Sequence, residues 1–205
     1  MKLLFRTLWM FALGLSFILA PTDTLYAAEI SKQNLAKYGQ QGGPFTLIDQ
    51  RGKTVQNTDF LGKYMFVFFG YTSCPDVCPT AMQTVSDSLD IMGDLGKDIQ
   101  PIFISVDPER DKPKILADFI SNFSPRIIAL TGDKKAIDEV TKAYGVRFEK
   151  VLESVSPSNT DQSYLINHFA GTFLMDRKGR FLVLFPSGIS PADMAKNLVN
   201  IVKKH

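Results

Sequence analysis

Short apolar runs recur along the chain, and their lengths are those of strands. The runs at 64–70 (YMFVFFG) and 101–106 (PIFISV) are apolar almost throughout, which favours buried central strands over helices. Residues 126–130 form a third, shorter run. Nearer the start, FTLID at 45–49 leads into a turn at RGK, after which KTV at 53–55 pairs back as a hairpin. The apolar runs therefore predict a sheet with a hairpin at its N-terminal side.

Amphipathic stretches separate these strands. Apolar residues recur at three- and four-residue spacing from Pro79 to a glycine at 93 or 96, over 112–123, and from Asp133 to Tyr144. This spacing predicts three helices that each bury one face, and Gly145 is expected to end the third. In the second helix, the residues expected to face inward are Ile115, Phe119 and Ile120.

The last part of the chain returns to strands. Residues 146–151 are a strand candidate, 153–163 are a polar loop, and 164–176 have the pattern of one interrupted strand. Residues 180–185 follow a turn at RKG and are expected to pair back as a hairpin. A final helix is expected from Ser190-Pro191 to about Lys203.

This order of elements points to one fold class. Strands that alternate with helices, then a hairpin and a helix, predict an α/β fold with a sheet of mixed direction. The order is the thioredoxin-like arrangement, with an added N-terminal hairpin and an inserted strand-helix pair at 126–144. The length of 205 residues suits one domain plus an appendage. The formal net charge of +2 gives no indication of a nucleic-acid partner.

The N-terminus has the pattern of an export signal. Lys2 and Arg6 precede an uncharged, mostly apolar run that is shorter than the roughly 20 residues of a membrane-spanning helix. We expect residues 1–27 to be a signal peptide or an N-terminal membrane anchor, 28–43 a linker, and 44–205 the folded domain. The protein is then exported, and is either periplasmic or attached to the outer face of the inner membrane.

Both cysteines lie in one stretch, YTSCPDVCPT, at 71–80. Cys74 follows a buried strand, and Cys78 lies where a helix begins. The free N–H groups and partial positive charge of a helix N-terminus favour thiolate, so both cysteines are expected to ionise more easily than a free cysteine. The spacing is compatible with a redox pair, a metal clamp or a structural disulfide. A disulfide that closes so short a loop constrains little chain entropy.

A histidine supplies a third soft ligand. His168 ends the apolar YLIN stretch, and the only other histidine is the final residue, His205. In a thioredoxin-like fold the position of His168 lies across from the cysteine loop. Two thiolates and an imidazole suit copper, and three ligands suit Cu(I). Zinc favours a fourth ligand, for which Asp76 or water is a poorer candidate. The predicted metal site is therefore Cys74, Cys78 and His168, with a core histidine as the plain alternative for His168.

Five segments together resemble the Sco (SenC-type) copper proteins: GGPFTLID, FGYTSCPDVCPT, FISVDPERD, LTGD and YLINHFAGTFLMDRKG. The resemblance implies a thioredoxin-like fold and a membrane-anchored or exported protein that assists copper delivery to the binuclear copper site of cytochrome c oxidase. By position, Cys74, Cys78 and His168 match the family's copper ligands. Asn167 departs from the pattern, because the family commonly has an aspartate there, and an amide cannot supply that negative charge.

Two functions follow. The first is a copper chaperone without turnover, which passes copper by ligand exchange to the copper-receiving subunit of cytochrome c oxidase or to another copper protein. The second is a thiol-disulfide oxidoreductase, in which Cys74 or Cys78 attacks a target disulfide and the other resolves it, with a thiol reductant as partner. Some members of the resembled family act on thiols. The inner membrane is a further partner if the signal is retained.

The remaining polar and soft residues have plainer interpretations. Asp76 is interpreted as a solvated loop residue. Asp107 and Arg110, in the DPERD turn, either pair to brace the site or are turn residues. The methionines within apolar patterns are interpreted as core rather than as copper ligands, and these are Met65, Met82, Met92 and Met175.

Overall fold

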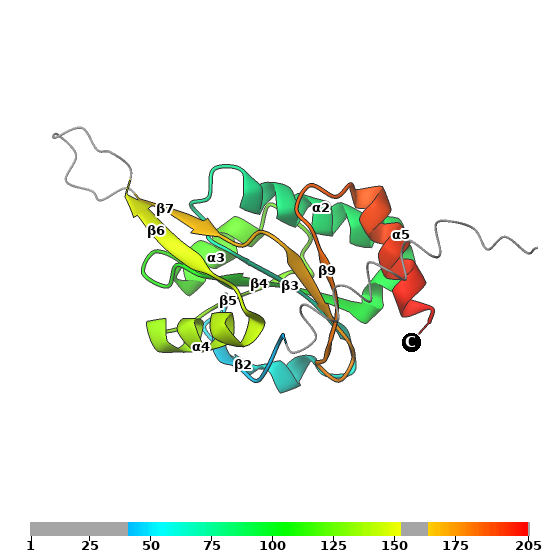
Figure 1. Cartoon of the computed structure of the whole chain (residues 1–205), viewed down its shortest axis with the longest axis horizontal. Coiled ribbons are helices and arrows are strands. Elements are labelled where there is room, and N and C mark those ends of the chain that lie inside the picture. The colour runs from blue at the N-terminus through cyan, green and yellow to red at the C-terminus, as the bar shows by residue number, and fades with distance from the viewer. Residues whose placement is uncertain (1–40, 153–163, 205) are drawn as a thin grey trace, which may run out of the picture.

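The computed structural model describes residues 41–152 and 164–204 (Figure 1). Its strands form a seven-stranded sheet in the order β2-β1-β5-β4-β3-β8-β9 and a two-stranded sheet of β6 and β7. The strands are β1 (Thr46–Asp49), β2 (Thr54–Gln56), β3 (Tyr64–Gly70), β4 (Ile99–Ser105), β5 (Ile128–Thr131), β6 (Phe148–Leu152), β7 (Tyr164–His168), β8 (Thr172–Met175) and β9 (Phe181–Phe185). The helices are α2 (Val77–Met92), α3 (Pro113–Ile120), α4 (Lys134–Tyr144) and α5 (Pro191–Val202), with short 3-10 turns η1 (Asn57–Phe60) and η2 (Gly93–Asp98).

The strand directions confirm the predicted fold class. β3, β4 and β5 are parallel, whereas β8 and β9 are antiparallel additions on the other side of β3. The N-terminal hairpin of β1 and β2 joins the sheet through β5, and β5 with α4 is the inserted strand-helix pair. Every residue of β3 is buried. The sheet is therefore mixed and thioredoxin-like, with β3 as its central strand.

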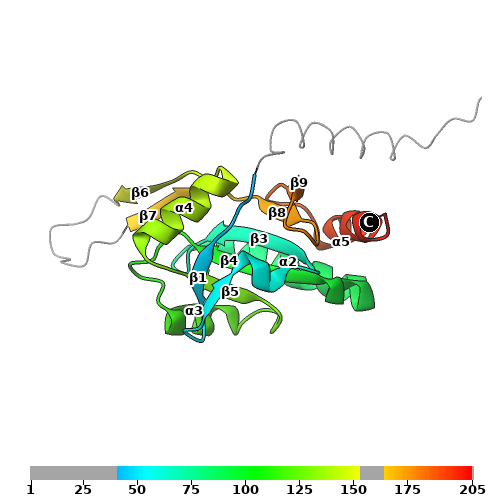
Figure 2. The same cartoon turned by 90° about the horizontal axis from the view of Figure 1, so that it is seen from below.

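Helices cover both faces of this sheet. Successive side chains of a strand point to opposite faces. On one face Phe69 contacts Tyr144 of α4, with ring centroids 5.2 Å apart. On the other face Phe68 contacts Phe103, which in turn contacts Phe119 of α3. Figure 2 shows α4 on one side of the sheet and α2 and α3 on the other, and α5 packs against α2.

The helix ends follow the capping signals in the sequence. Gly93 follows the last residue of α2 with φ 56°. Asp133 accepts a hydrogen bond from the Ala136 N–H at the start of α4, and Gly145 ends that helix in the left-handed region at φ 64°. Ser190 caps α5 in the same way. These predicted starts and stops are confirmed.

Two predicted details are wrong. Ile115 is 43% exposed, because the buried stripe of α3 consists of Leu116 and Ile120, four residues apart, and Ile115 lies outside that stripe. The expected interrupted strand at 164–176 is in fact two strands in different sheets, since β7 pairs with β6 and β8 pairs with β3 and β9. The chain changes partners at Phe169–Gly171.

Three loops meet at one edge of the main sheet. β3 and β4 run parallel, with Gly70 opposite Ser105, so the cysteine loop and the DPERD turn both follow strands that end at this edge. β8 is antiparallel to β3, with Phe68 opposite Thr172, so β8 begins there. Figure 1 shows β6 and β7 as an arm that projects from the body, and β7 ends at His168, just before β8. The topology therefore brings His168 to the cysteines.

No helix within the described ranges is long and apolar enough to cross a membrane. The predicted export segment at 1–27, most of the predicted linker at 28–43, the loop at 153–163 and His205 lie outside the described residues. The export segment, most of the linker and the loop at 153–163 therefore stay predictions.

Candidate metal centre

The three predicted ligands lie together. The Sγ atoms of Cys74 and Cys78 and a ring nitrogen of His168 are all within 4.8 Å of one another. Cys78 is buried, whereas Cys74 and His168 are partly exposed. Both cysteines carry free thiols in this structure. The arrangement groups two sulfur donors and one nitrogen donor at the protein surface, and their role as metal ligands stays a prediction.

The start of α2 fixes the two sulfurs. The first N–H groups of a helix have no partner within the helix. Here the Cys78 N–H donates to Cys74 Sγ at 3.4 Å, so the sulfur of one cysteine caps the turn that carries the other. Pro79 is tolerated because it lies in this first turn. The loop and the helix start thus hold both thiols in one local structure.

Close packing surrounds Cys78. A Cβ atom placed on Gly70 would lie 2.9 Å from Cys78 Sγ and 2.8 Å from Phe68 Cε1. Burial raises the pKa of the Cys78 thiol far above its usual value, and a hydrogen bond from the Tyr71 backbone offsets this only in part. The expectation that this cysteine ionises easily is therefore wrong, because burial away from water outweighs the field of the helix terminus.

His168 presents a free nitrogen to Cys78. Its Nδ1 is 3.0 Å from the Phe169 carbonyl oxygen, which can only accept, so Nδ1 carries the proton. Nε2 then has a free lone pair and lies 3.3 Å from Cys78 Sγ, where it accepts a hydrogen bond from the thiol. Burial lowers the His168 pKa, against the opposing effect of the Phe169 carbonyl, and keeps the ring neutral at pH 7. A neutral imidazole with its second nitrogen hydrogen-bonded is the usual form of a metal-binding histidine.

A buried carboxylate anchors the cysteine loop. Asp111 is fully buried and accepts hydrogen bonds from the Thr72 N–H at 3.0 Å, the Thr72 hydroxyl at 2.6 Å and the Ser105 hydroxyl at 2.6 Å. Burial raises the Asp111 pKa, although these hydrogen bonds act in the opposite direction. The DPERD turn thereby holds the residue two positions before Cys74.

The second part of the DPERD turn is an ion pair. Arg110 Nε pairs with Asp107 Oδ2, and Asp107 is fully buried. The Tyr164 hydroxyl donates to Asp107 Oδ1 at 2.7 Å. Of the two interpretations of this turn, the structure therefore supports the pair.

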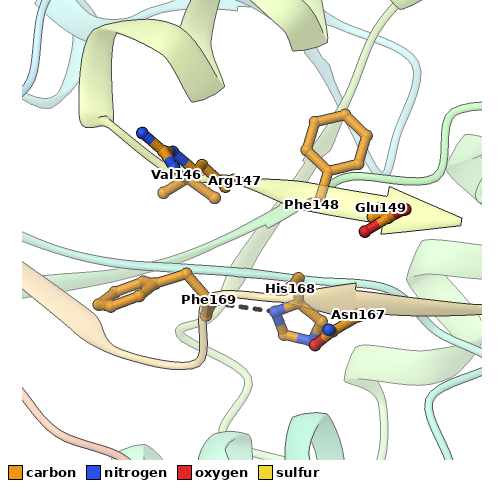
Figure 3. Close-up of a pocket in the computed structure, with 7 residues that line it drawn as sticks. All are labelled: Val146, Arg147, Phe148, Glu149, Asn167, His168 and Phe169. Carbon is orange, nitrogen blue, oxygen red and sulfur yellow. Dashed lines mark hydrogen bonds between the residues drawn. The ribbon is translucent and has the colours of Figure 1, made fainter.

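A hollow opens beside the histidine. Figure 3 shows its lining on two facing segments, one leading into and along β6 and the other at the end of β7. Asn167 is exposed in this hollow and lies opposite Glu149 in the β6–β7 register. The full lining consists of Val146, Arg147, Phe148, Glu149, Asn167, His168 and Phe169. His168 is therefore part of the wall of an open hollow.

The other candidate residues lie where they were expected. Asp76 is exposed and does not join the group of three. Four methionines are buried in the core, namely Met65, Met82, Met92 and Met175. Sequence reasoning missed Gly70, Tyr71, Asp111 and Tyr164. The available signal was that FGYTSC and DPERD each follow a buried strand, because parallel neighbours end at the same sheet edge.

The donor set favours a soft metal. Within residues 41–152 and 164–204, no other histidine, cysteine or carboxylate joins these three donors. Two sulfurs with one imidazole suit copper, whereas structural zinc sites use four protein ligands. The arrangement can bind a soft cation at three positions and leaves further positions for an incoming ligand.

Comparison with known proteins assigns the chain to a family. The SCO1/SenC family model matches residues 33–203. A SCO2-like protein of Rickettsia prowazekii is 39% identical over 162 residues, which cover 79% of this chain and 75% of that protein. Protein SenC of Rhodobacter capsulatus is 36% identical over 88% of this chain and 79% of its own. The structure of Bradyrhizobium japonicum ScoI with copper bound superimposes with a TM-score of 0.70 and 41% identity, and the match covers 78% of this chain and 98% of that one. The chain therefore belongs to the SCO1/SenC family.

Proposed function

We propose that this protein is an exported copper chaperone that binds copper through Cys74, Cys78 and His168 and delivers it to the binuclear copper site of cytochrome c oxidase. SCO1/SenC proteins as a family bind copper and act in cytochrome c oxidase assembly. The observation that carries the proposal is the gathering of two sulfurs and one free imidazole nitrogen within 4.8 Å.

Copper uptake exchanges thiol protons for a metal. In the metal-free protein the Cys78 thiol donates a hydrogen bond to His168 Nε2. Cu(I) would replace the protons of the Cys74 and Cys78 thiols, which leave to water, and both sulfurs and His168 Nε2 would then bind the metal. Because the three donor atoms already lie close together, uptake requires loss of these protons rather than a large movement.

Copper release proceeds by ligand exchange. Three-coordinate Cu(I) accepts a further soft ligand, so a thiol of the target can bind before a ligand of this protein leaves. Cys74 is the more exposed of the two sulfurs, and the hollow beside His168 admits the target from one side. We expect Cys74 to exchange first and the buried Cys78 to exchange last.

The test is copper binding by the full chain under reducing conditions. Native protein is expected to retain stoichiometric Cu(I) in competition with a chromophoric chelator, and His168→Ala is expected to bind at least about tenfold more weakly. His205→Ala is the matched control, because it removes the only other histidine. Weak binding by native protein, or equal binding by native protein and His168→Ala, would rule the site out.

One observation also supports a thiol-disulfide role. The partly exposed Cys74 sulfur accepts the N–H of Cys78 at a helix start, and Cys78 lies behind it as a second thiol. A Cys74 thiolate would attack a target disulfide and release one target thiolate, and Cys78 would then resolve the mixed disulfide. The products are a reduced target and a Cys74–Cys78 disulfide, which an external thiol reductant returns to two thiols. The greater exposure of Cys74 supports it, over Cys78, as the attacking residue in this alternative.

Trapping distinguishes this second role. Cys78→Ser is expected to accumulate a mixed disulfide between Cys74 and a disulfide-bonded target peptide, and Cys74→Ser is expected to accumulate none. If neither variant traps the peptide and native protein does not reduce it, the oxidoreductase role is excluded while copper binding is unaffected.

A further inference from the structure

One arginine lies between the two segments that carry the predicted ligands. The cysteine loop begins at Tyr71, and the histidine strand β7 begins at Tyr164. The Arg110 guanidinium lies 3.7 Å from the centroid of the Tyr164 ring and 5.7 Å from that of Tyr71. A guanidinium within about 6 Å of a ring centroid is attracted to the ring electrostatically. Arg110 therefore touches both segments at once.

The β7 side of this contact is tightly held. Arg110 Nη1 donates to the Tyr164 carbonyl oxygen at 3.0 Å, and Arg110 Nε pairs with the buried Asp107. The Tyr164 hydroxyl donates to the other carboxylate oxygen of Asp107 at 2.7 Å. The guanidinium, the carboxylate and Tyr164 thus form a closed set of contacts. We call Arg110 with Asp107, Tyr71 and Tyr164 the Arg110 clamp.

The other side of the clamp reaches the metal centre. Tyr71 is buried, and its ring meets the His168 ring edge to face, with centroids 5.8 Å apart. Phe68 makes a similar edge contact with His168 at 6.0 Å. The imidazole is therefore wedged between two aromatic rings, and one of these rings is in turn backed by Arg110. A change at Arg110 reaches His168 through Tyr71 and through β7.

Hydrogen bonding alone does not account for the position of the guanidinium. Arg110 Nη2 is buried and has no hydrogen-bond partner. A buried donor without a partner is unfavourable, so the contacts with Asp107 and the two rings must hold the guanidinium in place. The side chain is nevertheless 29% exposed, and its permanently protonated guanidinium cannot itself be a metal ligand.

We propose that Arg110 is a positioning residue that holds His168 Nε2 within binding distance of the two cysteine sulfurs and so sets the copper affinity and the geometry of the bound metal. This inference rests on the proposed function, because copper is the metal whose geometry is set. Outer residues that orient metal-binding histidines commonly change metal affinity by about 10- to 100-fold when they are replaced.

The chain offers a closely matched control. Arg177 also contacts a tyrosine ring, a backbone carbonyl and an aspartate: it lies 4.9 Å from the Tyr64 ring centroid, donates to the Gly62 carbonyl at 2.8 Å and pairs with Asp98 at 2.8 Å. Gly62 precedes β3 and Tyr64 begins it, at the end of the strand opposite the cysteine loop. Replacing Arg177 therefore removes the same kinds of contact without touching the metal centre.

The test compares Arg110→Lys and Arg110→Gln with Arg177→Lys and Arg177→Gln in the full chain. Cu(I) affinity is measured by chelator competition, and Cu(II) geometry by electron paramagnetic resonance. Arg110→Gln is expected to bind about tenfold more weakly with an altered Cu(II) spectrum. Arg110→Lys should show a smaller change, because it keeps the charge beside Asp107 and loses the planar stack. Both Arg177 variants should match native protein.

Two further measurements keep the outcomes separate. Thermal unfolding checks that each variant is folded, and if Arg110→Gln does not fold, the same criteria apply to Arg110→Lys. In metal-free protein, the alkylation of the two thiols is followed by intact mass. The slower step, which reports the buried Cys78, should become faster in the Arg110 variants only, because the packing over Cys78 loosens. Faster alkylation with no copper binding by native protein would support the clamp and refute the proposed function. The clamp would be overturned if the folded Arg110 variants kept the native Cu(I) affinity, Cu(II) spectrum and alkylation rate. It would also be overturned if the Arg177 variants lost as much Cu(I) affinity as the Arg110 variants.

Discussion

Gly70 lets the central strand end directly against a cysteine sulfur, and replacing it with alanine tests how tightly the centre is built. A Cβ at this position would lie 2.9 Å from Cys78 Sγ, 2.8 Å from Phe68 Cε1 and 2.9 Å from Phe103 Cε2. Ordinary contacts between such atoms are about 3.5–4.0 Å. One or more of these three neighbours must therefore move by roughly 0.5–1 Å, judged against that contact distance.

Movement on that scale matters more for metal binding than for folding. Inserting one methyl group into a packed core typically costs about 1–3 kcal/mol of unfolding free energy. Metal-ligand distances, however, hold to within about 0.2 Å, so displacement of Cys78 Sγ by several tenths of an ångström removes it from the best position. If binding loses 1–3 kcal/mol as well, Cu(I) affinity falls by about 5- to 150-fold.

The assay pairs chemical unfolding with chelator competition on Gly70→Ala and a control. Gly132→Ala is the control, because its added Cβ would also be crowded, at 3.0 Å from Leu47 Cδ2 and 3.3 Å from Ala136 Cβ, but on residues that do not contact the metal centre. Gly132→Ala is expected to lower stability and leave affinity unchanged. Gly70→Ala with Cu(I) affinity within about threefold of native would refute the reasoning, because an effect that small is typical of a surface substitution.

Three further predictions concern copper uptake and two buried carboxylates, Asp176 and Asp111. Cu(I) affinity should rise by about tenfold per pH unit for each proton released, because burial raises the Cys78 pKa and its thiol proton must leave; a flat profile in chelator competition would contradict this. Asp176→Asn should cost about 1–3 kcal/mol at neutral pH, because Asp176 accepts hydrogen bonds from Lys178 and Arg180 that outweigh burial and lower its pKa. The native advantage should vanish as pH falls through the lowered Asp176 pKa, and Asp94→Asn, at an exposed pair, should change stability little. Asp111→Ala should lower stability by about 1–3 kcal/mol and weaken copper binding, since both donors of Thr72 lose their acceptor; native copper affinity in that variant would argue against the anchor.

The parts of the fold that were predictable are those set by neighbours in sequence. The buried run that became β3, the cap at Asp133 and the stop at Gly145 depend on patterns a few residues long. Ile115 was misplaced because a one-residue error in the phase of a short helix turns a side chain by about 100°. The boundary between β7 and β8 was missed because strand pairing depends on residues far apart in the chain. The local sequence pattern therefore does not indicate that β7 and β8 belong to different sheets.

The site divides along the same line. The three candidate ligands could be named because the chain holds few soft donors and the fold places them at one edge. The burial of Cys78 was not predicted, because burial is a property of the assembled core: Cys78 Sγ, Phe68 and Phe103 all lie beside the position that a Cβ on Gly70 would occupy. The Arg110 clamp was missed for a similar reason, since its parts come from the loops after β3 and β4 and from the start of β7.

The burial of Cys78 also bears on which of the two functions the centre serves. A nucleophile must be a thiolate before it reacts, and burial of Cys78 opposes that form. A metal ligand needs no free thiolate, because the cation compensates the charge as the proton leaves. In the metal-free protein the Cys78 thiol instead donates a hydrogen bond to His168 Nε2, so these two donors already lie close together. Burial, not the imidazole, opposes the Cys78 thiolate, so attack on a target disulfide would fall to the partly exposed Cys74. His168→Ala should therefore weaken copper binding strongly, while it should leave the attack of Cys74 on a target disulfide nearly unchanged.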